Sequence, residues 1–351
     1  DADRECDIAY RARRSRRCAR QRTMCTPRTA SSRCRPASPR SSCTHPGRAS
    51  APLFHRARSH RARRWPATPP RAPAGPNIQE SDGRLSPVRT YQDLLSNPHD
   101  EALFAYHFTS QIATVALATG SRTTIGRPGL FARVSGAPDS QHLLVLRLKR
   151  PFSWLVPATR FARSVEVWNR RGDVIELADL PVADGIPIGG VTTAPRMHRW
   201  NPTQPATLVW SEAQDGGDPK TSVAHRDRLL VLTAPFEGTP LELVRTEFRF
   251  SGISWTEDGT ALVNESNRET RWTRTSLLYP GGSDTRRLFD RSVEDRYGDP
   301  GTPMRRPGRG VASTMILQYG NNIFLAGIGA SPLGDRPFID LLDLRTLKTT
   351  Q

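Results

Sequence analysis

The chain has 351 residues, of which 51 are Lys or Arg and 34 are Asp or Glu, giving a net charge of +17. The excess is confined to residues 1–75, where 19 arginines accompany four acidic residues, so that 32 basic and 30 acidic residues remain in the rest of the chain. The high overall charge therefore gives no reason to assign nucleic-acid binding to the whole chain. No run of 18 or more apolar residues is present, which excludes a membrane-spanning helix.

Residues 1–75 are rich in Arg, Ser and Pro and show no apolar period of 3.6 or 2, so we predict that this segment is disordered. All five cysteines lie in it, but the last four are separated by six, eight and eight residues, too far apart for the paired ligands of a zinc site. Three interpretations stay open: a basic arm that contacts phosphates, a transit peptide, or out-of-frame translation of a GC-rich gene. The presence of only three lysines favours the third.

The folded part is expected to begin at residue 76 and to carry a short helical insert at about 90–108. Thr90 and Asp93 resemble a capping box, which predicts a first short helix that ends before Pro98. Asp100 is placed to cap a second helix. A strand rich in β-forming residues should follow the insert.

A weak internal repeat follows this strand and extends to the end of the chain. Trp200 and Trp255, 55 residues apart, open two successive units, and each unit has an aromatic strand, a tight turn, two apolar strands and an edge strand. Four strands per unit at this period are typical of β-propeller blades. The sequence therefore predicts an all-β fold, an incomplete β-propeller of about four blades over residues 76–351, with a β-sandwich as the alternative. The four units centre on apolar runs at residues 142–148, 207–210, 261–263 and 323–325.

No motif in the chain supplies a catalytic site. A serine nucleophile on a strand-to-helix turn needs Gly-x-Ser-x-Gly, and no serine has that setting. No glycine loop is followed by lysine, so a P-loop is absent from the sequence. Asp215-Gly-Gly-Asp218 could offer two carboxylates to a cation, but it lacks the further oxygens of a calcium loop, and a hairpin loop is the preferred interpretation. We therefore expect no catalytic residue, no cofactor and no metal.

Three closely spaced arginines, Arg268, Arg271 and Arg274, are the candidate substrate-binding residues. Arginine binds carboxylates through two parallel hydrogen bonds, so a cluster of these side chains could select acidic ligands. The alternative is a solvated loop whose arginines pair with local acids.

Several strings resemble segments of the prolyl oligopeptidase family, and in particular its glutamyl endopeptidase branch, known from plastids and bacteria. The resemblance runs from about Gly75 to the end of the chain, and its most specific string is Glu-Ala-Gln-Asp-Gly-Gly-Asp at residues 212–218. The other matching strings lie at residues 88–95, 150–157, 251–255, 273–275, 288–292, 299–304 and 337–341.

The resemblance implies a two-domain serine peptidase, in which an N-terminal β-propeller gates substrate access to a C-terminal α/β-hydrolase domain with the catalytic triad. It also implies cleavage of peptides with a preference for glutamate. Only part of the propeller is matched, so no catalytic residue can be carried over, and the chain alone is expected to be inactive. The implied partners are a peptide substrate and the protein's own C-terminal hydrolase domain, with no membrane and no nucleic acid.

Within this resemblance, Arg268, Arg271 and Arg274 are expected to face the enclosed site and to help select acidic peptides. The competing class is a stand-alone propeller that binds a partner without catalysis. The sequence does not indicate a compartment; the resemblance favours a soluble protein of the bacterial cytoplasm or periplasm, and a plastid is also compatible with it. The abrupt start of the resemblance at Gly75 indicates that genuine coding sequence begins there.

Overall fold

The arginine-rich segment lies largely outside the part of the chain that the structure describes. The computed structural model describes residues 53–57, 69–71, 91–282, 284–307 and 314–350. The chain divides into two units, residues 1–48 and residues 49–351, and every described residue lies in the second. Strand β1 (Leu53–Ala57) pairs antiparallel with β2 (Thr109–Val115), so this short piece of the segment predicted to be disordered forms a strand that the sequence did not predict.

The helical insert differs from the prediction at its start. Residues 91–95 are not helical, and Asp93 has a φ of 58°, a left-handed conformation that cannot continue a helix, so the first predicted helix is wrong. The second prediction is confirmed as helix α2 (Pro98–Phe108), but its cap is Asn97, whose side chain accepts the backbone N–H of Asp100 at 3.0 Å. Asp100 lies in the first helical turn, where its negative carboxylate interacts favourably with the positive end of the helix dipole.

The long strand β3 (Arg122–Gly136) leads the chain from the insert into the sheets. Its first half pairs with β2, and its second half pairs with β4 (His142–Leu148), so that one strand takes part in two pairings at different positions along its length. At Gly126, with a φ of 62°, the backbone of β3 passes directly over the indole of Trp168, and an added Cβ would collide with that ring. Only glycine fits at this crossing.

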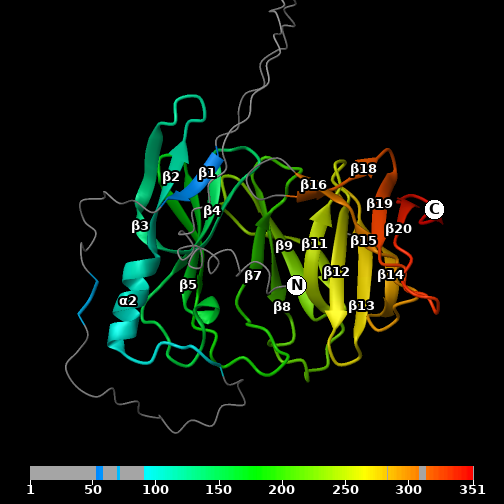
Figure 1. The fold of residues 1–351 in the computed structure, drawn as a ribbon, viewed down its shortest axis with the longest axis horizontal. Coiled ribbons are helices and arrows are strands. Elements are labelled where there is room, and N and C mark those ends of the chain that lie inside the picture. Colours follow the sequence, from blue (N-terminus) through cyan, green and yellow to red (C-terminus); the bar gives the residue numbers. More distant parts are fainter. Residues whose placement is uncertain (1–52, 58–68, 72–90, 283, 308–313, 351) are drawn as a thin grey trace, which may run out of the picture. The chain divides into compact units, whose positions relative to one another are not determined.

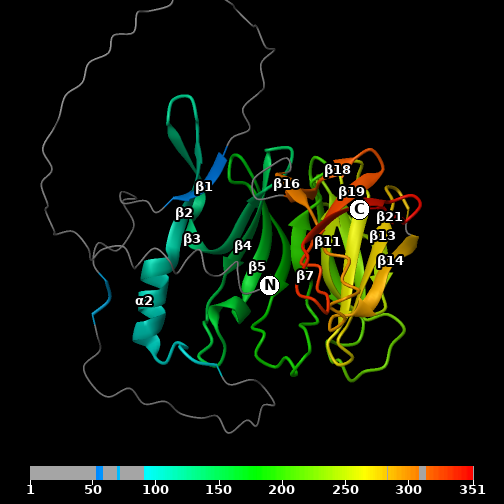
Figure 2. The ribbon, with the colours of Figure 1, turned by 45° about the vertical axis from the view of Figure 1, so that its right-hand side comes forward.

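Four antiparallel sheets of four or more strands follow one another in chain order, and the blades formed by the first three are meanders of consecutive strands (Figures 1 and 2). We call them blades 1 to 4. Blade 1 comprises the second half of β3, β4, β5 (Arg163–Asn169) and β6 (Val174–Leu180), with a 3₁₀ turn (Ala158–Arg160) before β5. Blade 2 comprises β7 (Arg196–Trp200), β8 (Thr207–Ala213), β9 (Asp227–Thr233) and β10 (Leu241–Thr246), and blade 3 comprises β11 (Arg249–Trp255), β12 (Ala261–Asn267), β13 (Trp272–Leu278) and β14 (Thr285–Ser292). Blade 4 comprises β15 (Thr302–Pro303), β18 (Gln318–Tyr319), β19 (Asn322–Gly327), β20 (Phe338–Asp343) and β21 (Thr349–Thr350).

Neighbouring blades are joined by separate apolar cores. In β4, Leu144 packs toward blade 2, whereas Leu143 and Val145 pack toward β2 and the first half of β3. Because successive residues of a strand point to opposite faces, a strand covered on both faces needs a continuous apolar run, as at 143–146. The same arrangement recurs between blades 2 and 3 and between blades 3 and 4. The predicted units therefore correspond to blades that stack face to face.

Blade 4 departs from the regular pattern. Its innermost strand is interrupted after Met304, where a hairpin of β16 (Arg305–Pro307) and β17 (Thr314–Ile316) is inserted before β18 resumes the pairing with β19. The side chain of Arg305 donates to the Ser254 hydroxyl of blade 3 at 2.8 Å. The described sheets do not close into a ring, so the all-β fold and the incomplete propeller of about four blades are confirmed.

Candidate functional site at the loop end of the blades

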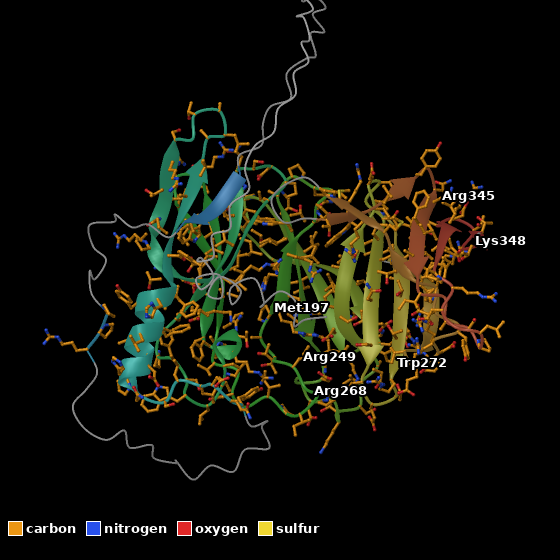
Figure 3. All side chains as sticks on the ribbon, in the orientation of Figure 1. Met197, Arg249, Arg268, Trp272, Arg345 and Lys348 are labelled. Carbon is orange, nitrogen blue, oxygen red and sulfur yellow. The ribbon has the colours of Figure 1, made fainter. Side chains whose placement is uncertain are left out.

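In an antiparallel meander, the turn between the second and third strands and the connection to the next sheet leave from the same end. We call this the loop end of the blades. Arg249, Arg268 and Trp272 all lie at this end, along the lower edge of the view in Figure 3. The loop end consists of residues 149–162, 181–195, 214–226, 247–248, 268–271, 293–301 and 328–337.

The three arginines predicted as a cluster lie on one hairpin but in different settings. Arg268 and Arg271 are exposed in the turn between β12 and β13, whereas Arg274 lies within β13. Arg274 contacts Glu247 at 2.6 Å and Asp290 at 3.0 Å, and its guanidinium stacks 3.9 Å from the ring centroid of Phe248. These contacts tie Arg274 to the connection between β10 and β11 and to β14.

The two turn arginines have fewer acidic partners. Arg271 contacts the exposed carboxylate of Glu294 at 3.3 Å. Arg268 lies beside Gly189 and makes no ion pair within the described part of the chain. An exposed ion pair holds its partners only weakly, so both turn arginines are accessible to a ligand, in contrast to Arg274.

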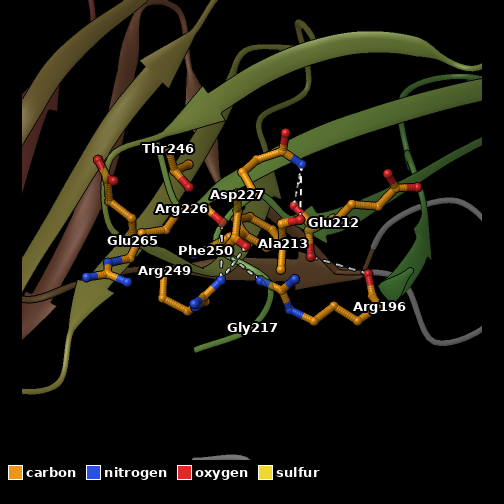
Figure 4. A network of polar contacts seen from close by, with 12 residues as sticks. Arg196, Glu212, Ala213, Gly217, Arg226, Asp227, Thr246, Arg249, Phe250 and Glu265 are labelled. Atoms are coloured by element: carbon orange, nitrogen blue, oxygen red, sulfur yellow. Dashed lines mark hydrogen bonds and ion pairs between the residues drawn. The ribbon is translucent and has the colours of Figure 1, made fainter. Parts of the chain in front are cut away.

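A buried ionic cluster links blades 2 and 3 at the same end, and no sequence pattern indicated it as a unit (Figure 4). The carboxylate of Asp215 accepts hydrogen bonds from Arg226 at 2.8 Å, from Arg249 and from the backbone N–H of Gly217 at 3.0 Å. Burial alone would raise the pKa of Asp215, but hydrogen bonds from Arg249 and Arg226 outweigh it and hold the pKa below its ordinary value. The loop at Asp215 is thus structural, and its first carboxylate is occupied by arginines.

The second carboxylate of the cluster is Asp227, the first residue of β9. Its carboxylate accepts hydrogen bonds from Arg249 at 2.8 Å and from the backbone N–H of Phe250 at 2.7 Å. The Nη2 atom of Arg196 lies 2.5 Å from Oδ2 of the same carboxylate. Both Asp215 and Asp227 have side chains that are 0% exposed. Removing a partner from such a buried charge is costly, so the cluster fixes blade 3 against blade 2.

Gly217 lets the loops around the cluster approach each other. Gly217 has a φ of 77°, and its Cα faces the carbonyl oxygen of Val191, so that an added Cβ would collide with that oxygen. The backbone N–H of Val191 in turn donates to the carbonyl of Gly217 at 3.0 Å. This close backbone contact joins the connection before β7 to the loop after β8.

Metal-ligand clusters and membrane-spanning helices are both absent from the part of the chain that the structure describes. They contain no group of three or more His, Cys, Asp or Glu side chains placed to hold a metal ion. Among them, no helix is long and apolar enough to cross a membrane. The loop end carries several guanidinium groups, some exposed and some buried, and guanidinium groups are suited to binding carboxylates.

The comparisons with known proteins point to one group of peptidases. No family model matches the chain. It is 40% identical over 293 residues to "Probable glutamyl endopeptidase, chloroplastic" of Oryza sativa subsp. japonica, which covers 80% of this chain and 31% of that protein. The protein of the same name from Arabidopsis thaliana is 40% identical over 296 residues, covering 80% of this chain and 30% of that protein. The chain spans about a third of the length of these relatives.

Solved structures of peptidases overlay on the chain only loosely. The β-propeller domain of the Trilobed protease from Pyrococcus furiosus gives a TM-score of 0.39 at 12% identity, covering 67% of this chain and 60% of that chain. Dipeptidyl peptidase 4 from Porphyromonas gingivalis gives 0.41 at 10% identity, covering 69% and 37%. Scores this low carry no argument, and the relationship rests on the sequence identity. The chain is therefore a relative of the probable glutamyl endopeptidases, and it matches about a third of their length.

Proposed function

We propose that the chain is the propeller part of a serine peptidase that hydrolyses peptide bonds with a preference for glutamate, and that the propeller controls which substrates reach the catalytic centre. The observation that carries the proposal is the 40% identity to probable glutamyl endopeptidases across 80% of the chain. The four consecutive blades support it, because their loops gather at one end where a substrate can be recognised.

Catalysis is proposed to come from an α/β-hydrolase domain outside these 351 residues, since no serine of the chain lies in a Gly-x-Ser-x-Gly motif. Such a domain would cleave the peptide through a serine acyl-enzyme, with a histidine base and an oxyanion hole. Peptide substrates and this hydrolase domain are then the partners of the propeller.

The arginines of the β12–β13 hairpin are proposed to favour acidic peptides. Arg268 and Arg271 present accessible positive charge at the loop end, and Arg274 holds the hairpin through its ion pairs with Glu247 and Asp290. Accessible arginines raise the local concentration of anionic ligands and can bind a carboxylate directly.

A fusion protein tests this function. The full chain is joined in frame to the parts of the rice protein that lie outside the match, and kcat/KM is measured on a peptide with one Glu and on its Ala counterpart, beside the same rice parts without this chain. We expect the fusion to prefer the Glu peptide by about tenfold or more. Arg268→Ala should reduce this preference, and Arg245→Ala, on β10, should not.

A folded fusion that hydrolyses neither peptide would contradict the peptidase assignment. That result would favour the alternative, a stand-alone propeller that binds a partner without catalysis. A fusion that is active but equally fast on both peptides would leave the peptidase assignment standing and would reject the preference for glutamate.

A further inference from the structure

The buried ionic cluster at the loop end contains more guanidinium groups than carboxylates. Three guanidinium groups, those of Arg196, Arg226 and Arg249, surround the two carboxylates of Asp215 and Asp227. A charge removed from water is costly unless it is paired, and the two carboxylates are already shared among the three arginines. One further anion would balance the cluster.

The unmatched group is Arg196. Arg226 and Arg249 each donate to at least one aspartate and to a backbone carbonyl, at Pro219 and Arg226 respectively. In Arg196, by contrast, Nη1 is buried without a hydrogen-bond partner in the described part of the chain, and Nη2 contacts Asp227 without the geometry of a hydrogen bond. Buried donors nearly always have an acceptor, so Nη1 is available to donate to an oxygen of a ligand.

The backbone of β7 holds Arg196 in this position. The pairing between β7 and β8 shifts register between Arg196 and Arg199, and Met197, at the bulge, has a φ of 60° (labelled in Figure 3). A bulge redirects the side chain at its edge, and a non-glycine residue in the left-handed region stores strain that is common at functional sites. The side chain of Arg196 is 11% exposed, so its orientation is fixed by its surroundings.

We propose that Arg196 binds a carboxylate of an acidic peptide, with Nη1 as a donor and the carboxylate as the anion that balances the cluster. This inference rests on the proposed function and names the group that would recognise glutamate. A carboxylate fits because it brings a single negative charge and matches the planar fork of one guanidinium. A phosphate group would bring up to two charges and further oxygens, for which a single unsatisfied guanidinium edge offers too few donors.

This role differs in kind from that of Arg268. Arg268 is exposed and would attract acidic peptides from solution, whereas Arg196 is buried and oriented before the ligand arrives. A group that is already oriented loses little freedom on binding and discriminates strongly between a carboxylate and its neutral isostere. Glutamate and glutamine are such a pair, so their ratio of affinities reports on Arg196.

A binding experiment on the full 351-residue chain tests the proposal. Two labelled five-residue peptides with blocked ends, one with a central Glu and one with a central Gln, are titrated with the chain, and fluorescence anisotropy gives Kd. We expect the Glu peptide to bind at least about tenfold more tightly than the Gln peptide. Arg196→Gln should bring this ratio close to one, and Arg245→Gln should leave it unchanged.

Folding of the variant is checked by its urea midpoint. Asp227 keeps Arg249 and the Phe250 N–H as partners in Arg196→Gln, so we expect the variant to fold. If it does not fold, Arg196→Lys is the second variant. Lysine keeps the positive charge but lacks the planar guanidinium group, so this variant should retain only part of the preference for the Glu peptide over the Gln peptide.

Two results would overturn the proposal: equal binding of both peptides by the unmodified chain, or an unchanged ratio in the folded Arg196 variants. In either case Arg196 takes no part in recognising the carboxylate of a peptide. The proposed function fails separately, through a folded fusion protein that hydrolyses no peptide. A fusion that prefers Glu while the Arg196 variants keep the same preference would reject only the role of Arg196.

Discussion

Among single residues, His198 shows how burial controls a titratable group. It is 5% exposed, and its ring stacks on Trp210 with the centroids 5.6 Å apart. Burial lowers the pKa of His198 to about 4; the carboxylate of Glu212 opposes this shift and the guanidinium of Arg133 adds to it. Burial therefore stabilises the neutral imidazole of His198 relative to the charged one.

This pKa makes stability depend on pH. As pH falls, the unfolded chain, with a histidine pKa near 6.5, takes up the proton before the folded chain does, so stability is present above pH 6.5 and is lost as pH falls toward 4. We expect His198 to cost about 2 kcal/mol of unfolding free energy between pH 7 and pH 5. Urea unfolding of the chain and of His198→Gln at both pH values measures this. The same pH dependence in both proteins would contradict it.

The residue pairs of the site could not be predicted from the sequence. The hairpin loop at Asp215 was predicted from its glycines, because turn residues act locally. Its partner Arg249 belongs to the next blade, and the contact of Asp227 with Arg196 joins two strands of blade 2 that are not adjacent. Such pairs depend on how strands stack in three dimensions, which spacing along the chain does not reveal.

Among the elements, the strands were largely predictable and the irregular insertions were not. A continuous apolar run flanked by turns indicates a strand that is buried on both faces, and β4, β8, β12 and β19 all have this character. The hairpin of β16 and β17 went unpredicted, because its strands are three residues long and one contains proline. Its place is set by contacts with blade 3, which the local sequence does not encode.

The loop contact at Gly217 gives a test at this scale. Gly216 and Gly217 both have positive φ, but an added Cβ at Gly216 meets nothing within 4 Å, whereas at Gly217 it would collide with the Val191 carbonyl. Gly216→Ala should therefore cost about 1 kcal/mol, the cost of a left-handed alanine. Gly217→Ala should cost about 1–3 kcal/mol more, because the two loops must separate. If urea unfolding shows that Gly216→Ala and Gly217→Ala lose the same unfolding free energy, the contact between the two loops is contradicted.

For the molecule as a whole, the stacking of blades leaves one sheet face without a neighbour among the described residues. In blade 4, Ile323, Leu325 and Leu342 pack toward blade 3, and the alternate positions point to the other side. On that side, Ile339 is 62% exposed, and its register partner is Ala326. An exposed apolar sheet face is a site of association.

We expect this face to cause self-association of the 351-residue chain. Ile339→Lys places a charge at the centre of the face without touching the core with blade 3, so it should lower the apparent mass at a given protein concentration. Arg245→Lys, on blade 2, is the matched surface control. Sedimentation velocity across a concentration series measures the effect, and a chain that remains monomeric before the substitution would reject it.

The shared strand β3 has a consequence for how the molecule opens. Because its two halves are hydrogen-bonded to β2 and to β4, neither pairing can be released without disturbing a strand of the other. Blade 4 shares no strand with blade 3, and its innermost strand is interrupted by the hairpin of β16 and β17. Regions that open independently exchange their amide hydrogens faster. Amide protection should therefore fall along the chain, from a slow cooperative unit around β3 to a fast one in blade 4.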